Sequence, residues 1–279
     1  MEEIARNIYI ERNYSGVVLG VLKLAHGILL VDTPFFAKDQ QSWRVKISNL
    51  GGGIDKLLLL LDPQIDRARG IHAMGTNVLA HENTNDFMSN KHISSHWQES
   101  GMGAEVDRYD LPAIIKWIEP RLTYTNEISI HWDKAPLVVS HRPGAHIAGS
   151  WLRYDAEHVV FVGDSVILDQ PPFLAWSDLD CWLKELAYLG TSFLKDYKII
   201  SSRDGVVNSG SVYNMINFLT RVKEEVKSLL LQENWRDSIN AVVSVLLEYF
   251  VFNRQLAALY RNRLTWGLEQ YIQNRIPVQ

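Results

Sequence analysis

The sequence predicts a mixed α/β fold in which two β-sheets pack against each other and helices cover them. Three observations support this prediction. Apolar or alternating runs bounded by turn residues dominate the first two-thirds of the chain. The segments between these runs are short and amphipathic and do not alternate regularly with the strands, which favours hairpins over a strict βαβ repeat. From about residue 209 the pattern changes to long helical segments.

The elements follow from these patterns in chain order. Alternating and continuous apolar runs predict strands at 7–12, 16–24 and 27–32, an amphipathic stretch predicts a helix at 38–50, and the run of five leucines at 57–61 predicts a buried strand. The same criteria predict further strands at 77–81, 127–131, 136–141, 150–155, 158–163 and 197–201. Further short helices are expected at 66–75, 84–90, 110–118 and 178–190.

The helical segments that follow divide the chain into a body, residues 1–208, and a C-terminal helical extension, residues 209–279, that packs on it. The extension is rich in aromatic residues, more than two or three helices facing one core require. They either pack on the body or form a dimer contact or a lid over a pocket. These residues are Trp235, Tyr249, Phe250, Phe252, Tyr260, Trp266 and Tyr271.

Composition excludes several classes of partner. The formal net charge is -4 and no run of Lys or Arg occurs, so we expect neither nucleic acid nor an anionic membrane as a partner. The single cysteine, Cys181, excludes an internal disulfide and a cysteine-based zinc site. No apolar run reaches the roughly 18 residues that a membrane span needs. The sequence therefore predicts a cytoplasmic protein.

One turn carries most of the candidate chemistry. The leucine strand runs directly into Asp62-Pro63-Gln64-Ile65-Asp66-Arg67. Side chains at the alternate positions 62 and 64 point to the same side of the chain as it leaves the strand. Asp66 and Arg67 then begin a helix, from which their side chains can face the same cavity.

With other landmarks in the same order, this turn resembles the metallo-β-lactamase superfamily over about residues 5–230. The landmarks are Asp32-Thr33-Pro34, the turn at 62–67, VLAHENT at 78–84, HRPGAHIAGSWLRYDAEHVVFVGDSVI at 141–167 and IISSRDGVV at 199–207. The resemblance implies an αββα sandwich with its site at the sheet edges, where loops from both halves meet. It also implies a hydrolase that uses metal ions.

At the turn, the superfamily has His-x-His-x-Asp-His, the core of a two-metal site. Carried over by position, the first metal site of this chain would consist of Asp62, Gln64, His146 and Asp164. The second would retain an Asp ligand but have arginines in place of its two histidines, and an arginine stays protonated and has no lone pair to donate. The resemblance therefore implies at most one divalent ion (Zn, Fe or Mn), or none.

The arginines that replace the second metal site are Arg67 and Arg203. Two guanidinium groups in the place of a dication suggest charge replacement, in which they pair with Asp66 and Asp164. The alternative is that the arginines point elsewhere. If they pair, Asp66 has a lowered pKa and is a poor general base at neutral pH.

Other residues carry weaker signals. By the resemblance, Asp32 supports the site through hydrogen bonds from behind the ligands. His92 and His96 are four residues apart and would share a helix face, although a solvated loop is the simpler interpretation. His72 and His81 match no ligand position and are expected to be structural.

Three functions remain open. The first is a hydrolase in which one metal ion activates water against an ester, lactone, thioester or phosphoester. The second is a non-catalytic, metal-free protein whose Arg67 and Arg203 pocket binds a small anionic ligand, or which binds a partner, with a homodimer through the C-terminal helices as one form. The third is a metal-free enzyme whose arginines stabilise an oxyanion. The catalytic candidates are Asp66, Arg67 and Arg203.

Overall fold

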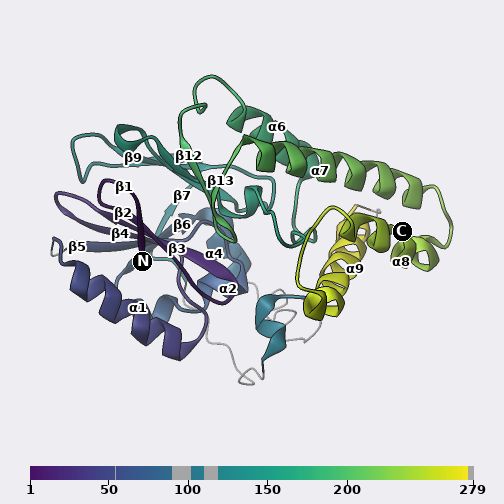
Figure 1. Cartoon of the computed structure of the whole chain (residues 1–279), viewed down its shortest axis with the longest axis horizontal. Helices are drawn as coiled ribbons and strands as arrows, with labels where there is room; N and C mark the ends of the chain where they lie inside the picture. Colours follow the sequence, from purple (N-terminus) through teal and green to yellow (C-terminus); the bar gives the residue numbers. More distant parts are fainter. Residues whose placement is uncertain (54, 90–101, 110–118, 276–279) are drawn as a thin grey trace.

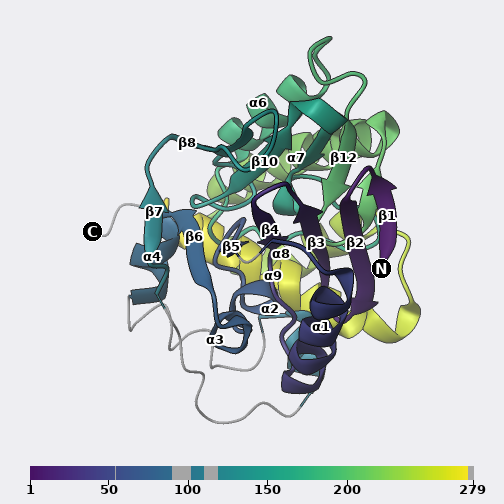
Figure 2. The same ribbon diagram turned by 90° about the vertical axis from the view of Figure 1, so that its left-hand side faces the viewer.

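The computed structural model describes residues 1–53, 55–89, 102–109 and 119–275, and its elements form the layers helix, sheet, sheet, helix (Figure 1). The predicted two-sheet α/β architecture is confirmed. The view turned by 90° shows α1 (Ala37–Leu50) on one outer face, and α6 (Leu179–Leu189) with α7 (Ser209–Leu230) on the opposite face (Figure 2).

The first sheet has seven strands in sequence order. Its first four strands pair antiparallel, and the pairs from β4 to β7 are parallel. The carboxyl ends of β4, β5 and β6 therefore meet at one edge, the arrangement that gathers loop residues into a site. The strands are β1 (Glu2–Ala5), β2 (Ile8–Tyr14), β3 (Val17–Lys23), β4 (Gly27–Val31), β5 (Asp55–Leu59), β6 (Asn77–His81) and β7 (Leu122–Tyr124).

The second sheet has six strands in the order β13-β12-β11-β10-β9-β8. Only the β11–β12 pair is parallel. Its strands are β8 (Glu127–Ile130), β9 (Leu137–His141), β10 (Ser150–Tyr154), β11 (Val159–Phe161), β12 (Lys198–Ser201) and β13 (Gly205–Val207).

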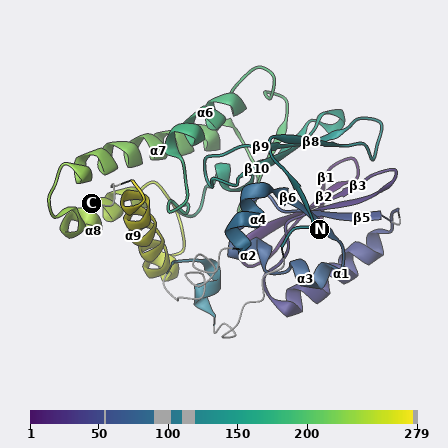
Figure 3. The ribbon, with the colours of Figure 1, turned by 180° about the vertical axis from the view of Figure 1, so that it is seen from behind.

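Four short helices and the rest of the extension complete the described elements. Beside the first sheet lie α2 (Ile65–Ala68), α3 (Ile71–Met74), α4 (Glu82–Ser89) and the 3-10 helix η1 (Glu105–Arg108). The extension continues with α8 (Trp235–Leu247), the 3-10 helix η4 (Arg254–Leu256) and α9 (Ala257–Gln273). Two further 3-10 turns are η2 (Asp155–Glu157) and η3 (Gly163–Ser165). Seen from behind, α8 and α9 lie together at one end of the sandwich (Figure 3).

All ten predicted strands are present, with ends shifted by up to two residues. The predictions missed β1, β7 and β13, which are too short to show an alternating pattern. The helix predicted at 66–75 is instead two helices, broken at Gly70, where any side chain would collide with the Pro34 carbonyl. The helix predicted at 110–118 lies outside the described residues.

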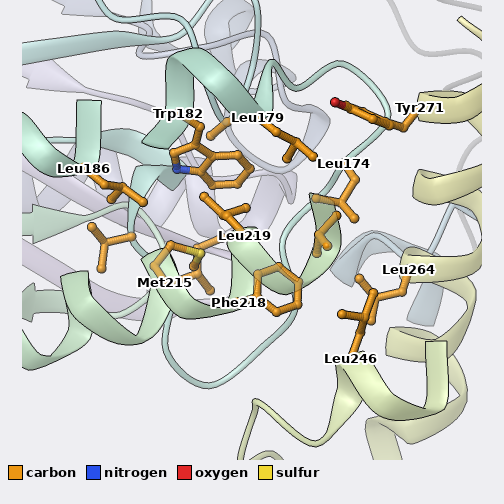
Figure 4. Close-up of a cluster of buried hydrophobic side chains, with 14 of the residues drawn as sticks. Leu174, Leu179, Trp182, Leu186, Met215, Phe218, Leu219, Leu246, Leu264 and Tyr271 are labelled. Carbon is orange, nitrogen blue, oxygen red and sulfur yellow. The ribbon is translucent and has the colours of Figure 1, made fainter. Parts of the chain in front are cut away.

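Separate apolar clusters hold the layers together. Between the sheets, Phe161 packs so closely on Gly20 that a Cβ there would lie 2.6 Å from its ring. Trp43 anchors α1 on the other face of the first sheet. The largest cluster joins the second sheet and α6 to the extension through residues such as Trp182 and Phe218 (Figure 4). The extension therefore packs on the body, which accounts for most of its aromatic residues.

No helix within the described ranges is long and apolar enough to cross a membrane.

Candidate functional site

The predicted site residues follow the ends of neighbouring strands. Asp62 and Gln64 follow β5, and Asp66 and Arg67 lie on α2, so all four come from the first sheet. The second sheet contributes His146 after β9, Asp164 in η3 after β11, and Arg203 between β12 and β13. All of these side chains are buried.

The turn at Asp62 is held by its own side chain. Asp62 Oδ1 accepts a hydrogen bond from the backbone N–H of Gln64 (2.9 Å), an Asx-turn that redirects the chain from the strand into α2. The backbone N–H of Leu61 donates to Asp32 Oδ1 (3.0 Å), and the Ser202 hydroxyl donates to Asp32 Oδ2 (3.1 Å). Asp32 therefore supports the turn and also ties it to the second sheet.

Arg67 bridges two carboxylates. Its Nη1 donates to Asp62 Oδ2 (3.1 Å), its Nη2 donates to Asp164 Oδ1, and Nη1 lies 3.8 Å from Asp32 Oδ2. The two arginines were expected to pair with Asp66 and Asp164 between them, and Arg67 pairs with Asp164, whereas Asp66 pairs with Arg203. Asp66 and Arg67 are consecutive on α2, and successive helical residues point in different directions.

Arg203 pairs with both expected carboxylates. Its Nε and Nη2 donate to the two oxygens of Asp164 (3.0 and 3.1 Å), and its Nη1 donates to Asp66 Oδ2 (2.7 Å). The same Nη1 also donates to the Gly16 carbonyl (2.7 Å). Two-point contact with a carboxylate is the strongest geometry that a guanidinium group offers.

We call the side chains of Asp62, Asp66, Arg67, Asp164 and Arg203 the ion cluster. Its pairs cross between the sheets in both directions: Arg67 from the first sheet binds Asp164 from the second, and Arg203 from the second binds Asp66 from the first. The cluster is thus a cross-link at the edge of the sandwich.

Negative charge exceeds positive charge here, because the three carboxylates of the ion cluster and the carboxylate of Asp32 face two guanidinium groups. Burial alone would raise the pKa of Asp164, but Arg203 and then Arg67 hold it well below its usual range. Burial raises the pKa of Asp32 to about 7, against the effect of Arg67, and also raises the pKa of Asp62. Burial thus opposes the ionised form of Asp32 and Asp62, whereas the two guanidinium groups favour the ionised form of Asp164.

His146 is oriented against metal binding. Its Nδ1 accepts the backbone N–H of Ala148 (3.0 Å), so the proton of the neutral ring sits on Nε2. Burial lowers its pKa to about 3, with Arg67 adding to the effect, so the ring stays neutral. Nε2 has no hydrogen-bond partner among the described residues. It has no lone pair to offer unless the Ala148 bond breaks.

The donor set therefore does not fit a divalent ion. The Arg67 guanidinium stands between Asp62 and Asp164, two of the four predicted ligands, and His146 presents an N–H. Over residues 1–53, 55–89, 102–109 and 119–275, no three His, Cys, Asp or Glu side chains are grouped so that they could hold a metal ion. Metal chemistry at the predicted ligands would require Arg67 to leave.

Within the described part of the chain, no histidine bonds to the ion cluster. His81 is buried, with Nε2 2.6 Å from the Thr125 carbonyl oxygen and Nδ1 accepting from the backbone N–H of Asn83 (3.1 Å), a structural role. Its ring stacks on His141 at 3.7 Å. His92 and His96 lie outside the described residues.

Sequence reasoning missed three buried groups next to the cluster, namely Glu105, Phe173 and Arg263, and named Tyr260 only as one of the aromatic residues of the extension. Glu105 and Arg263 contact each other although 158 positions separate them, and no motif marks either residue. An arginine on an otherwise apolar helix face was the one available signal.

Comparison with solved structures identifies the fold. A metallo-beta-lactamase family protein from Thermus thermophilus aligns with a TM-score of 0.65 and 15% identity, over 96% of this chain and 93% of that one. A metallo-beta-lactamase from Pontibacter korlensis aligns at 0.60 and 14%, over 78% and 97%. A double mutant of the sec-alkyl sulfatase PisA1 aligns at 0.63 and 12%, over 99% of this chain but 52% of that one.

The chain therefore has the metallo-β-lactamase fold, as the resemblance implied. No protein-family model matches the sequence, and no curated protein does.

Replacing Arg203 by leucine should lower the free energy of unfolding by about 3–5 kcal/mol, because Asp66 and Asp164 are left buried and less compensated. Urea unfolding followed by tryptophan fluorescence measures this loss. Arg221→Leu is the matched control: its ion pair with Glu225 is partly exposed, with side chains 41% and 16% exposed, so the change should stay below about 1 kcal/mol. Equal losses in the two variants would show that the cluster does not stabilise the fold.

Replacing Asp32 by asparagine should flatten the dependence of stability on pH. The folded-state pKa of Asp32 is about 7, above its ordinary value of 3.8, so the folded chain binds the proton more tightly than the unfolded chain does. Its contribution to stability is therefore lost as pH rises from about 4 to 7, by at most about 1.4 kcal/mol per pH unit. Unfolding free energies across this range should fall less steeply for Asp32→Asn, and an unchanged slope would contradict the assignment.

Proposed function

We propose that this protein is a metal-free, non-hydrolytic protein of the metallo-β-lactamase fold that acts by binding a partner. One observation carries the proposal: the guanidinium groups of Arg67 and Arg203 lie among the carboxylates that the resemblance assigns to metal ions. Cationic side chains then supply permanently the positive charge that metal ions would supply.

The groups present also offer little for hydrolysis without metal. Asp164 is held ionised by two guanidinium groups and is a poor general base. His146 accepts the Ala148 N–H at Nδ1, so its other nitrogen, Nε2, carries a proton and has no lone pair with which to act as a base. Arg203 uses Nε, Nη1 and Nη2 on neighbouring carboxylates and the Gly16 carbonyl. An oxyanion or an anionic ligand would have to displace a carboxylate to reach it.

Partner binding is therefore the non-catalytic alternative that the contacts support best. Exposed apolar side chains are concentrated in the extension, where Leu231 is 82% and Val251 88% exposed, with Tyr213, Leu230 and Tyr249 also exposed. Apolar groups left in water favour association. A second copy of this chain, bound through these helices, is the partner we propose.

Sedimentation velocity over a range of protein concentrations tests this partner. The native chain should show a concentration-dependent dimer, and the double variant Leu231→Ser with Val251→Ser should remain a monomer because the apolar contact is lost. Phe193→Ser, which changes an exposed apolar residue outside the extension, should leave the dimer intact. A native chain that is monomeric at every concentration would contradict the homodimer.

A single-metal hydrolase acting on an ester, lactone, thioester or phosphoester is the second candidate. It is supported by the enzymes that share this fold, and by the absence of hydrogen-bond partners for Asp66 Oδ1 and His146 Nε2 within the described part of the chain. It requires Arg67 to withdraw from Asp62 and Asp164 and His146 to change its tautomer.

Elemental analysis of protein purified without chelator separates the two candidates. We expect no stoichiometric zinc, iron or manganese, and no rise of the melting temperature when these ions are added, because a bound ion would stabilise the folded state. His146→Ala should be indistinguishable from the native chain in both measurements. Stoichiometric metal that disappears in His146→Ala would overturn the metal-free proposal.

A further inference from the structure

Arg263 is completely buried although it belongs to the helical extension. Its Nε donates to the Gly103 carbonyl (2.6 Å), and its Nη1 donates to Gln170 Oε1 (2.7 Å) and the Pro171 carbonyl (2.9 Å). Its Nη2 lies 3.5 Å from Glu105 Oε1. These partners belong to the body of the chain, so the buried charge of Arg263 is compensated only while α9 is docked there.

This arginine lies next to the ion cluster. The Phe173 ring has the Arg263 Cζ 4.4 Å from its centroid and the Arg203 Cζ 5.6 Å from it, so one ring contacts both cations. The Tyr260 hydroxyl donates to Glu105 Oε1 (3.0 Å). Residues one turn apart on α9 therefore hold the two groups, Phe173 and Glu105, that border the cluster.

A second row of contacts extends from α9 to the other side of the centre. The ring of Trp266 lies 5.2 Å from that of Trp176, which lies 5.0 Å from Phe87, which in turn lies 5.0 Å from His146. These aromatic side chains share an apolar cluster with Ile65 of α2. The helix thus reaches both the arginine side and the histidine side of the former metal site.

The backbone of α9 packs closely against the backbone of the body at two glycines. Gly103 has φ +74°, and a Cβ there would collide with the backbone of Arg263. On the facing turn of the helix, a Cβ on Gly267 would lie 3.2 Å from the backbone nitrogen of Leu174. Both glycines let the helix backbone approach the loops directly. Such a close backbone approach indicates a specific packing of α9 on the body of the chain. Figure 1 shows α9 beside the short helix that carries Glu105.

A cavity brings solvent close to the ion cluster. This cavity of about 320 Å³ is lined by Arg12, Gly16, Glu105, Arg203 and Tyr260, among others. The Arg203 side chain nevertheless has no exposed surface. Tyr260 and Glu105 contact each other at the wall of this cavity, so the docked helix forms part of the wall beside Arg203.

We infer that α9 is an intramolecular plug, anchored by Arg263, that covers the ion cluster and must be released before a ligand can reach it. The inference rests on the proposed function, because an active hydrolase of this fold would have to move the helix to admit each substrate. It adds that the cluster can be opened locally, by release of α9, without unfolding of the sheets.

A buried thiol reports such opening. The reporter is Gln64→Cys in a Cys181→Ser background, and its reference is Val21→Cys, a buried position in the first sheet away from α9. Reaction with Ellman's reagent should be slow at both sites in the otherwise native chain. Arg263→Leu should accelerate the reaction of the Gln64→Cys thiol at least about tenfold more than the reaction of the Val21→Cys thiol. Local opening by release of α9 should expose the first thiol and leave the second buried.

Arg261→Leu is the matched control, because Arg261 lies on the same helix but is exposed and donates a hydrogen bond to Ser244, which also belongs to the extension. It should accelerate neither thiol. Equal acceleration of the two thiols by Arg263→Leu would mean global destabilisation and would overturn the plug. A Gln64→Cys thiol that already reacts fast in the otherwise native chain would overturn it as well.

The two proposals fail in different measurements. Elemental analysis of the same samples decides whether metal is bound, independently of thiol reactivity. Stoichiometric metal with a protected Gln64→Cys thiol would overturn the metal-free function but not the closure by α9. A metal-free chain with an exposed Gln64→Cys thiol would overturn the closure by α9 but not the metal-free function.

Discussion

The carboxylate of Asp164, shared between two guanidinium groups, is the contact on which this structure depends. Arg67 reaches it from the first sheet and Arg203 from its own sheet, and neither arginine has an exposed side chain. The buried charges of Asp164, Arg67 and Arg203 compensate one another, since each would strongly destabilise the fold if it were buried alone. The segment after β5, η3 and the β12–β13 connection must therefore take positions that allow all of these ion pairs to form together.

A buried ion cluster of this kind specifies structure more than it stabilises it. Desolvation offsets much of the attraction between the ions, whereas losing one partner leaves the others uncompensated. Burial also raises the pKa of Asp32 and Asp62, which opposes the ionised form of both carboxyl groups. Apolar packing between the sheets supplies the main stabilisation, and the ions determine how the sheet edges meet.

The sequence was sufficient for the layers and for the strand end at which the candidate residues gather, because apolar runs mark buried strands and the turn at 62–67 follows one of them. It was insufficient for contacts set by side-chain direction. Arg67 pairs with Asp62 and not with its neighbour Asp66, a difference that depends on how α2 is oriented. The seat of Arg263 on Gly103 joins residues 160 positions apart, and local patterns carry no information about such contacts. Three strands of three or four residues escaped detection because their pairing, not their composition, defines them.

The sharing of Asp164 also constrains the evolutionary paths open to this chain. Exchanging either arginine for histidine leaves the other guanidinium on the carboxylate that a metal ion would need, so the first step toward metal binding costs stability and confers no ligand site. Two or more coordinated changes would have to arise together. The shared carboxylate thus places metal binding beyond the reach of any single arginine-to-histidine exchange.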